Sequence, residues 1–193
     1  MPTHGMSESS EGVGIVEAAR VGNIVLTGMM GTGKTAVGRY LAEQLKIPFY
    51  DLDELIEQET GLSISAIFRE RGEADFRALE RELVTRLCEL HGCIIATGGG
   101  TIVNPDNLRR LRKHGEIICL TAAPERILER VEGMDHRPLL WHADKLERIR
   151  EVMRVREAVY AQVGEPIDTT SLSVEDVAAR ILARVQLREV LKG

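Results

Sequence analysis

From residue 22 onward, short apolar runs alternate with longer segments in which apolar residues recur every three or four positions. The first pattern is typical of strands buried in a parallel sheet, and the second of amphipathic helices. The predicted strands cover residues 23–27, 47–50, 93–97, 116–120 and 166–168. The predicted helices cover residues 35–45, 54–59, 63–70, 73–90, 124–131 and 145–163, and two more begin near residues 104 and 173. This alternation predicts an α/β fold in three layers, with a five-stranded parallel sheet between two layers of helices.

The same pattern suggests how the chain is divided. Residues 1–21 have no periodicity and are rich in Ser, Gly and Glu, so we expect a flexible N-terminal tail. Residues 22–193 are then one domain, which suits the total length of 193 residues. Irregular stretches around residues 60–80 and 133–145 interrupt the repeat, and a fold of this kind keeps its substrate-specific parts in such insertions.

Composition narrows the classes of function. The chain has 25 Lys+Arg against 30 Asp+Glu, a net charge of −5, whereas a general binder of nucleic acid or anionic membranes is basic. No apolar run is long enough to span a bilayer, and the N-terminus lacks the features of a secretory signal. The cysteines, Cys88, Cys93 and Cys119, are odd in number and form no C-x-x-C pair. We therefore expect reduced, buried thiols in a cytoplasmic protein.

The strongest motif follows the first predicted strand. Residues 28–35, GMMGTGKT, match G-x-x-x-x-G-K-[ST] and lie between that strand and a predicted helix, which is the context the motif requires. Glycines let such a loop wrap a phosphate with its N–H groups pointing inward, and the helix N-terminus adds partial positive charge. Lys34 can reach the β- and γ-phosphates, and the hydroxyl of Thr35 can bind Mg²⁺. The loop predicts binding of a nucleoside triphosphate.

Two carboxylates follow the second predicted strand. Asp51 and Asp53 are two positions apart, so strand geometry would place both side chains on one face, at the edge where such sheets bind ligands. One could hold Mg²⁺ through water, and the other could accept a proton or a hydrogen bond from a hydroxyl group. The pair also precedes a predicted helix, so an N-cap is the alternative role.

Three arginines are candidates for anion binding. Arg77 lies near the start of the long predicted helix, where Glu73 and Glu80 would be ordinary surface partners, and Arg156 lies in an Arg-rich helix. From the residues alone, a solvated helix face and a binding role remain open for both. Arg137 differs because it stands beside Pro138 in an irregular segment, where it could approach developing phosphate charge.

Taken together and in order, six motifs resemble the shikimate kinase family. The resemblance extends from about residue 23 to residue 181. The motifs are GMMGTGKT at 28–35, DLD at 51–53, ADFRALE at 74–80, TGGG at 97–100, HRPLL at 136–140 and REAVY at 156–160. It implies a P-loop kinase fold with a substrate-binding insertion at about 54–80 and a mobile lid at about 133–145. The implied reaction is ATP-dependent phosphorylation of the 3-hydroxyl of shikimate, a step of chorismate and aromatic amino acid biosynthesis.

The resemblance also assigns roles to residues. It implies ATP binding by Gly31, Thr32, Gly33, Lys34, Thr35, Ala36, Arg130 and Arg137, with Arg130 flanking the adenine. It implies shikimate binding by Asp53, Arg77, Gly98, Gly99, Gly100 and Arg156. Lys34, Asp53 and Arg137 would be catalytic, and Thr35 would hold one Mg²⁺ together with Asp51 through water. The partners would be shikimate and ATP, with no nucleic acid or membrane, and the protein would act as a monomer.

Two departures from the family pattern and three alternatives remain. Residues 168–172 supply no basic residue beneath the adenine, and the REAVY segment lacks the usual Pro-Leu before Tyr160. A gluconate-type or nucleotide P-loop kinase would share the phosphate loop and, for gluconate, an arginine for the carboxylate. A catalytically silent shikimate kinase-like module would be expected to lose Lys34, Asp53 or Arg137, and all three are present. A P-loop switch protein would need a water-positioning residue and switch loops, which we do not identify.

Overall fold

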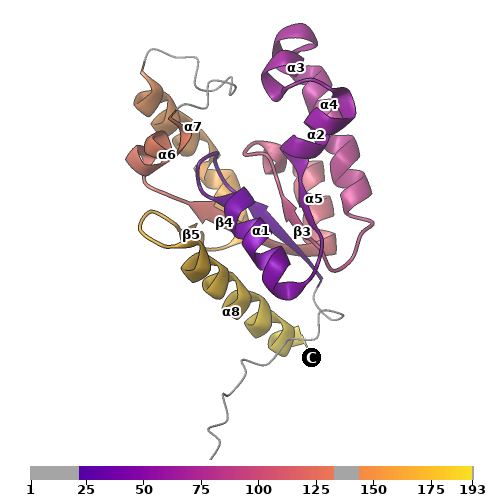
Figure 1. Ribbon diagram of the computed structural model, residues 1–193, viewed down its shortest axis with the longest axis vertical. Coiled ribbons are helices and arrows are strands. Elements are labelled where there is room, and N and C mark those ends of the chain that lie inside the picture. Colours follow the sequence, from indigo (N-terminus) through magenta and orange to yellow (C-terminus); the bar gives the residue numbers. More distant parts are fainter. Residues whose placement is uncertain (1–21, 133–143, 193) are drawn as a thin grey trace, which may run out of the picture.

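The computed structural model describes residues 22–132 and 144–192, and its strands form a parallel sheet in the order β2-β3-β1-β4-β5 (Figure 1). The strands are β1 (Asn23–Thr27), β2 (Phe49–Asp51), β3 (Ile94–Ala96), β4 (Gly115–Thr121) and β5 (Ile167–Asp168). The helices are α1 (Lys34–Leu45), α2 (Leu52–Thr60), α3 (Ile64–Glu70), α4 (Gly72–Leu87), α5 (Pro105–His114), α6 (Pro124–Val131), α7 (Lys145–Tyr160) and α8 (Val174–Lys192), with short 3₁₀ turns η2 (Thr101–Val103) and η4 (Ala161–Val163). The predicted five-stranded parallel sheet is confirmed. The expected tail and lid lie largely outside the described residues.

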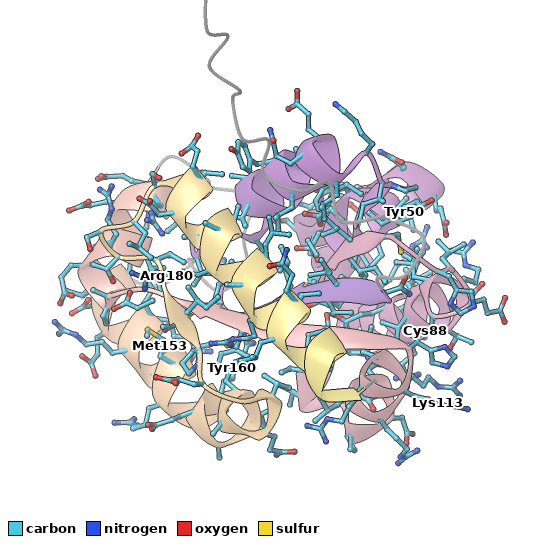
Figure 2. All side chains as sticks on the ribbon, turned by 90° about the horizontal axis from the view of Figure 1, so that it is seen from below. Tyr50, Cys88, Lys113, Met153, Tyr160 and Arg180 are labelled. Carbon is cyan, nitrogen blue, oxygen red and sulfur yellow. The ribbon has the colours of Figure 1, made fainter. Side chains whose placement is uncertain are left out.

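Helices cover both faces of the sheet because its central strands are buried on both sides. In β1, Ile24 and Leu26 pack with α1 and α8 on one face, and Figure 2 shows α8 lying across the strands. Val25 points to the opposite face and packs with residues of α4 and α5. Alternate residues of a strand point to opposite faces, so a continuous apolar run fills both cores. The result is the expected three layers.

Helices α2, α3, α6 and α7, together with the first part of α4, rise above the carboxyl ends of the strands. In Figure 1, α2, α3 and α4 stand on one side of this edge, and α6 and α7 stand on the other. The first group packs around Ile56, Ile67 and Phe76, and the second around Ile127 and Ile149. Each group therefore has its own small core, and the two are joined through the sheet.

Several boundaries differ from the prediction. Helix α4 ends at Leu87 rather than at residue 90, and Leu90 is partly exposed rather than part of the apolar stripe. The second strand begins at Phe49, and Asp53 lies in the first turn of α2 rather than beyond the strand. Asp51 causes this change because its side chain caps α2, accepting hydrogen bonds from the backbone N–H groups of Asp53 and Glu54. None of the helices within residues 22–132 and 144–192 combines the length and apolar character that crossing a bilayer requires.

The three cysteines are buried and unpaired, as expected. Burial raises the pKa of Cys93 and of Cys119 to about 11. At pH 8 about one such thiol in a thousand is the reactive thiolate. We expect Cys93 and Cys119 of the native protein to be alkylated by iodoacetamide roughly a hundredfold more slowly than in guanidinium chloride. Labelling followed by mass spectrometry measures this, and rapid labelling of either residue in the native protein would contradict it.

Candidate active site

The loop between β1 and α1 is shaped by glycines. Gly28, Gly31 and Gly33 have φ angles of 130°, 74° and 93°, which residues with a Cβ rarely adopt. At Gly28 the space is also closed, because a Cβ would lie 2.1 Å from the carbonyl oxygen of Leu120. Position 28 therefore requires glycine for two reasons, which are its φ angle and the close approach of its backbone to β4.

Lys34, the first residue of α1, lies across this loop. Its Nζ donates hydrogen bonds to the carbonyl oxygens of Gly28 and Met29, each at 2.8 Å. The ammonium group is thus positioned beside the helix N-terminus, which itself carries partial positive charge. Both features favour an anion in the loop.

Thr35 and Asp51 form the next part of the site. The hydroxyl of Thr35 donates to Oδ2 of Asp51 at 2.7 Å, while Oδ1 of Asp51 accepts from the backbone of α2. Burial raises the pKa of Asp51, and the hydrogen bond from Thr35 opposes the shift. Asp51 therefore caps a helix and also presents a carboxylate beside the phosphate loop, so both roles left open by the sequence are compatible.

The donor set around Thr35 and Asp51 fits Mg²⁺. A hydroxyl and a carboxylate are hard oxygen ligands, and Mg²⁺ bound with a nucleotide takes one or two such groups and keeps phosphates and waters as its other ligands. Within residues 22–132 and 144–192, no group of three or more His, Cys, Asp or Glu side chains forms a metal cage. The residues therefore suit an ion that arrives with a nucleotide rather than one held by protein alone.

Asp53 meets the glycine loop that follows β3. A Cβ on Gly98 would lie 3.0 Å from Oδ1 of Asp53 and 3.2 Å from Oε1 of Glu80. Glycine at this position therefore leaves room for two carboxylates on one side of the loop. The two aspartates reach the site from different elements, Asp51 from the end of β2 and Asp53 from α2.

Arg77 is held by a buried carboxylate. Its Nη1 donates to Oε2 of Glu80 at 2.9 Å, and the hydroxyl of Thr101 donates to Oε1 of Glu80 at 2.6 Å. Glu73 accepts from the other side of the guanidinium, through Nε and Nη2. Burial opposes the charge of Arg77, but Glu80 and Glu73 raise its pKa above the ordinary value. The guanidinium is therefore charged and fixed at the wall of the site.

Glu80 corrects one expectation. It is 1% exposed and is not a surface partner of Arg77, because α4 packs this side toward the turn at Thr101. Burial raises its pKa, and the hydrogen bond from Thr101 and the charge of Arg77 oppose that shift. Reasoning from the sequence missed this role, although the three-residue spacing from Arg77 within ADFRALE places both side chains on one side of a helix.

Arg156 approaches from the opposite side, on α7. Its Nη1 donates to the carbonyl oxygen of Gly99 at 2.9 Å, and the hydroxyl of Tyr160 donates to the same oxygen at 2.7 Å. Burial raises the pKa of Tyr160, which is labelled in Figure 2, so the phenol remains a donor. Two residues one helical turn apart thus attach α7 to the loop after β3. The REAVY spacing contained this pair, but the role of Tyr160 was not predicted.

Most of the residues described above line one cleft of about 380 Å³. Its apolar lining includes Ile64, Phe68, Phe76, Val152 and Val155, and its polar lining consists of Lys34, Thr35, Asp51, Asp53, Glu73, Arg77, Glu80, Thr97, Gly98, Gly99, Gly100, Arg148, Glu151 and Arg156. Lys34 and three arginines thus share the cleft with carboxylates from β2, α2, α4 and α7. The structure therefore brings together the predicted shikimate-binding residues and the predicted metal-binding pair.

Other predicted residues lie outside that lining. Gly31, Thr32 and Gly33 belong to the phosphate loop, and Ala36 is exposed in the first turn of α1. Arg130 of α6 donates to the carbonyl oxygen of Gly31 at 3.1 Å. Arg137 lies outside the described residues.

The fold and the phosphate loop together define a P-loop nucleotide-binding protein of the α/β class, and comparison with known proteins narrows this class. Residues 30–186 match the family model described as Shikimate kinase. The chain is 44% identical over 160 residues to a shikimate kinase of Caldanaerobacter subterraneus subsp. tengcongensis, covering 83% of this chain and 94% of that protein. It is 45% identical over 168 residues to a shikimate kinase of Geobacter metallireducens, covering 87% and 94%. This chain belongs to the shikimate kinase family.

Solved structures agree with this assignment. The structure of shikimate kinase from Acinetobacter baumannii in complex with shikimate has a TM-score of 0.84 and 35% sequence identity, and covers 88% of this chain and 95% of that one. A gluconokinase from Sinorhizobium meliloti has a TM-score of 0.56 at 18% identity, with 89% and 95% covered, which is a likeness of fold alone.

Proposed function

We infer that this chain transfers the γ-phosphoryl group of ATP to the 3-hydroxyl of shikimate. The observation that carries this inference is the presence of Lys34, Asp53, Arg77 and Arg156 in one cleft beside the phosphate loop. Shikimate has a carboxylate and three hydroxyl groups on a rigid ring. Of the residues that line the cleft, Arg77, Arg156 and Asp53 match those groups, and the family to which the chain belongs is described as Shikimate kinase.

We propose that Arg77 and Arg156 bind the carboxylate of shikimate. A guanidinium offers two parallel N–H donors, which match the two oxygens of a carboxylate. Asp53 accepts hydrogen bonds from the ring hydroxyls, and Gly98, Gly99 and Gly100 let the backbone approach the ring. The fixed position of Arg77 supports this assignment, because a side chain already ordered by Glu80 loses less conformational entropy on binding.

On the nucleotide side, the phosphates lie in the loop of Gly31, Thr32 and Gly33, with Ala36 at the start of α1 and Lys34 over the β- and γ-phosphates. Mg²⁺, held by Thr35 and through water by Asp51, would neutralise phosphate charge when bound. Arg130 is proposed to flank the adenine. Its contact with the carbonyl oxygen of Gly31 supports a place beside the nucleotide.

The transfer forms one bond and breaks one. The 3-hydroxyl oxygen of shikimate attacks the γ-phosphorus, and the bond between that phosphorus and the bridging oxygen to the β-phosphate breaks, leaving ADP. We propose that the hydroxyl proton passes to Asp53, whose side chain lines the same cleft. Lys34 stabilises the charge that develops on the phosphoryl oxygens.

A coupled assay of ADP release tests the inference. Shikimate should stimulate ADP release well above a control without shikimate, and gluconate or a nucleoside monophosphate should not. Release that responds to gluconate instead would reject shikimate as the substrate. A chain that binds ATP and shikimate without turnover would be a silent binding module.

We propose that Arg137 closes over the transferring phosphate, as part of a lid at residues 133–145. Arg137→Ala is expected to lower kcat roughly a hundredfold while KM for shikimate changes by less than about threefold. Steady-state kinetics with both substrates varied measures this. A rise in KM for shikimate with kcat intact would reject the role.

We also propose the organisation expected from the sequence: a tail at residues 1–21, one kinase domain at 22–193 and a substrate-binding insertion at 54–80. The packing of α2, α3 and α4 into a small core of their own supports the insertion. We further propose that the enzyme acts as a monomer in the cytoplasm. The free cysteines and the use of ATP support that compartment.

A further inference from the structure

Thr169, which follows β5 directly, is a buried polar residue, 2% exposed. All of its polar groups are used. Its N–H donates to the carbonyl oxygen of Thr121 at 2.8 Å, and its hydroxyl donates to the carbonyl oxygen of Thr32 at 3.1 Å. Its hydroxyl oxygen accepts from Nη1 of Arg130 at 3.0 Å, and its carbonyl oxygen accepts from Nη2 of Arg130 at 2.7 Å.

These contacts join three segments that are far apart in the sequence. Thr169 contributes from the end of β5, Arg130 from α6, and Gly31 and Thr32 from the phosphate loop. Nη1 of Arg130 donates to the carbonyl oxygen of Gly31 and to the hydroxyl of Thr169, and that hydroxyl donates to the carbonyl oxygen of Thr32, so two successive carbonyl groups of the loop are held from one side. A buried hydroxyl that donates to the loop and accepts from the arginine is the centre of this arrangement.

Holding those carbonyls also orients the N–H groups of the loop. In a planar trans peptide, the C=O and N–H bonds point in opposite directions. The carbonyl of Gly31 shares a peptide plane with the N–H of Thr32, and the carbonyl of Thr32 shares one with the N–H of Gly33. With both carbonyls directed toward Arg130 and Thr169, the N–H groups of Thr32 and Gly33 are directed away from them.

We propose that Thr169 is a positioning residue for ATP. Its hydroxyl, together with Arg130, fixes the peptide planes of the phosphate loop so that the N–H groups of Thr32 and Gly33 are aligned for the phosphates. The proposal rests on the proposed function, because it concerns the nucleotide site of that reaction. Thr169 itself follows β5 and does not line the cleft, so its effect on phosphate binding acts through the loop.

The test compares three variants of the full chain. Thr169→Val keeps the shape of the side chain and removes the hydroxyl, Thr169→Ser restores the hydroxyl, and Thr170→Val is the control. Thr170 is the neighbouring residue, and its hydroxyl contacts Asp168 and the N–H of Ala123 but not the phosphate loop. Thr169→Ala replaces the valine variant if that protein does not fold.

Binding is measured without shikimate, so the result does not depend on the proposed reaction. We expect Thr169→Val to weaken binding of MgADP and of inorganic tripolyphosphate about tenfold, as measured by calorimetry or competition against ATP. Tripolyphosphate is the sharper probe because it lacks the base, and a loss limited to ADP would place the effect at the adenine and overturn the proposal. Thr169→Ser and Thr170→Val should stay within about twofold of the wild type.

Kinetics and melting temperatures separate positioning from a purely structural role. We expect Thr169→Val to raise KM for ATP about tenfold and leave KM for shikimate within about twofold. A fall in melting temperature with unchanged tripolyphosphate and MgADP binding would make Thr169 a structural residue only and overturn the proposal. Failure of Thr169→Ser to restore binding would overturn it as well. If Thr169→Val weakens binding of MgADP and tripolyphosphate as expected but the wild-type protein does not phosphorylate shikimate, the proposed reaction is rejected and the role of Thr169 stands.

Discussion

Asp53→Asn is expected to lower kcat for shikimate phosphorylation roughly a thousandfold, with a much smaller change in KM for shikimate. Asparagine has nearly the same shape and can still accept a hydrogen bond from a ring hydroxyl, but it cannot take up the proton. Asp53 lies in the first turn of α2, which Asp51 caps, so its position is set by backbone hydrogen bonds that the substitution leaves intact. The loss should therefore fall on the chemical step.

Steady-state kinetics and single-turnover measurements separate binding from chemistry in this variant. Asp75→Asn is a suitable control, because Asp75 is an acidic residue of α4 that pairs with Arg71 at 3.8 Å and lies outside the cleft. We expect the control to retain wild-type kinetics, and MgADP binding to be unchanged in both variants. If Asp53→Asn raised KM with kcat near that of the wild type, Asp53 would bind shikimate without accepting its proton.

Glu80→Ala is expected to lower the free energy of unfolding by about 2 kcal/mol, because it removes the buried partner of a partly buried ion pair. The side chain of Glu80 is 2% exposed, and its loss leaves Arg77 without its buried partner and the hydroxyl of Thr101 without an acceptor. The same change leaves the guanidinium of Arg77 with the exposed carboxylate of Glu73 as its ion-pair partner. We therefore also expect KM for shikimate to rise about tenfold, which corresponds to about 1.4 kcal/mol of lost binding.

Glu73→Gln is the control for Glu80→Ala, because it changes the other carboxylate that contacts Arg77. Glu73 contacts the same guanidinium at 3.1 Å, but its side chain is 65% exposed, and an exposed ion pair contributes under about 1 kcal/mol. Chemical denaturation and shikimate kinetics of both variants measure the difference. If Glu80→Ala and Glu73→Gln had equal effects, burial of Glu80 would not be what orders Arg77.

The phosphate loop and the sheet were predictable because their signals are local. The sequence GMMGTGKT contains the glycines, the lysine and the threonine within eight positions, and the strand before it and the helix after it are read from short-range periodicity. Asp51 and Asp53 were also identified, but their geometry was not, because the cap at Asp51 begins the helix two residues earlier than the apolar pattern indicates. Element boundaries depend on such hydrogen bonds, which a pattern of apolar residues does not contain.

By itself, the sequence determined the fold class, the phosphate loop and a set of motifs that resembles one family. What it left open was which charged side chains meet. Arg77 and Arg156 were equally consistent with solvated helix faces until α4 and α7 were placed on opposite sides of one cleft. The burial of Glu80 against Thr101 depends on packing between elements 21 residues apart, and the bond from Thr169 to Thr32 spans 137 residues. Contacts of that range arise only when the sheet orders its strands, so the tertiary structure alone decided them.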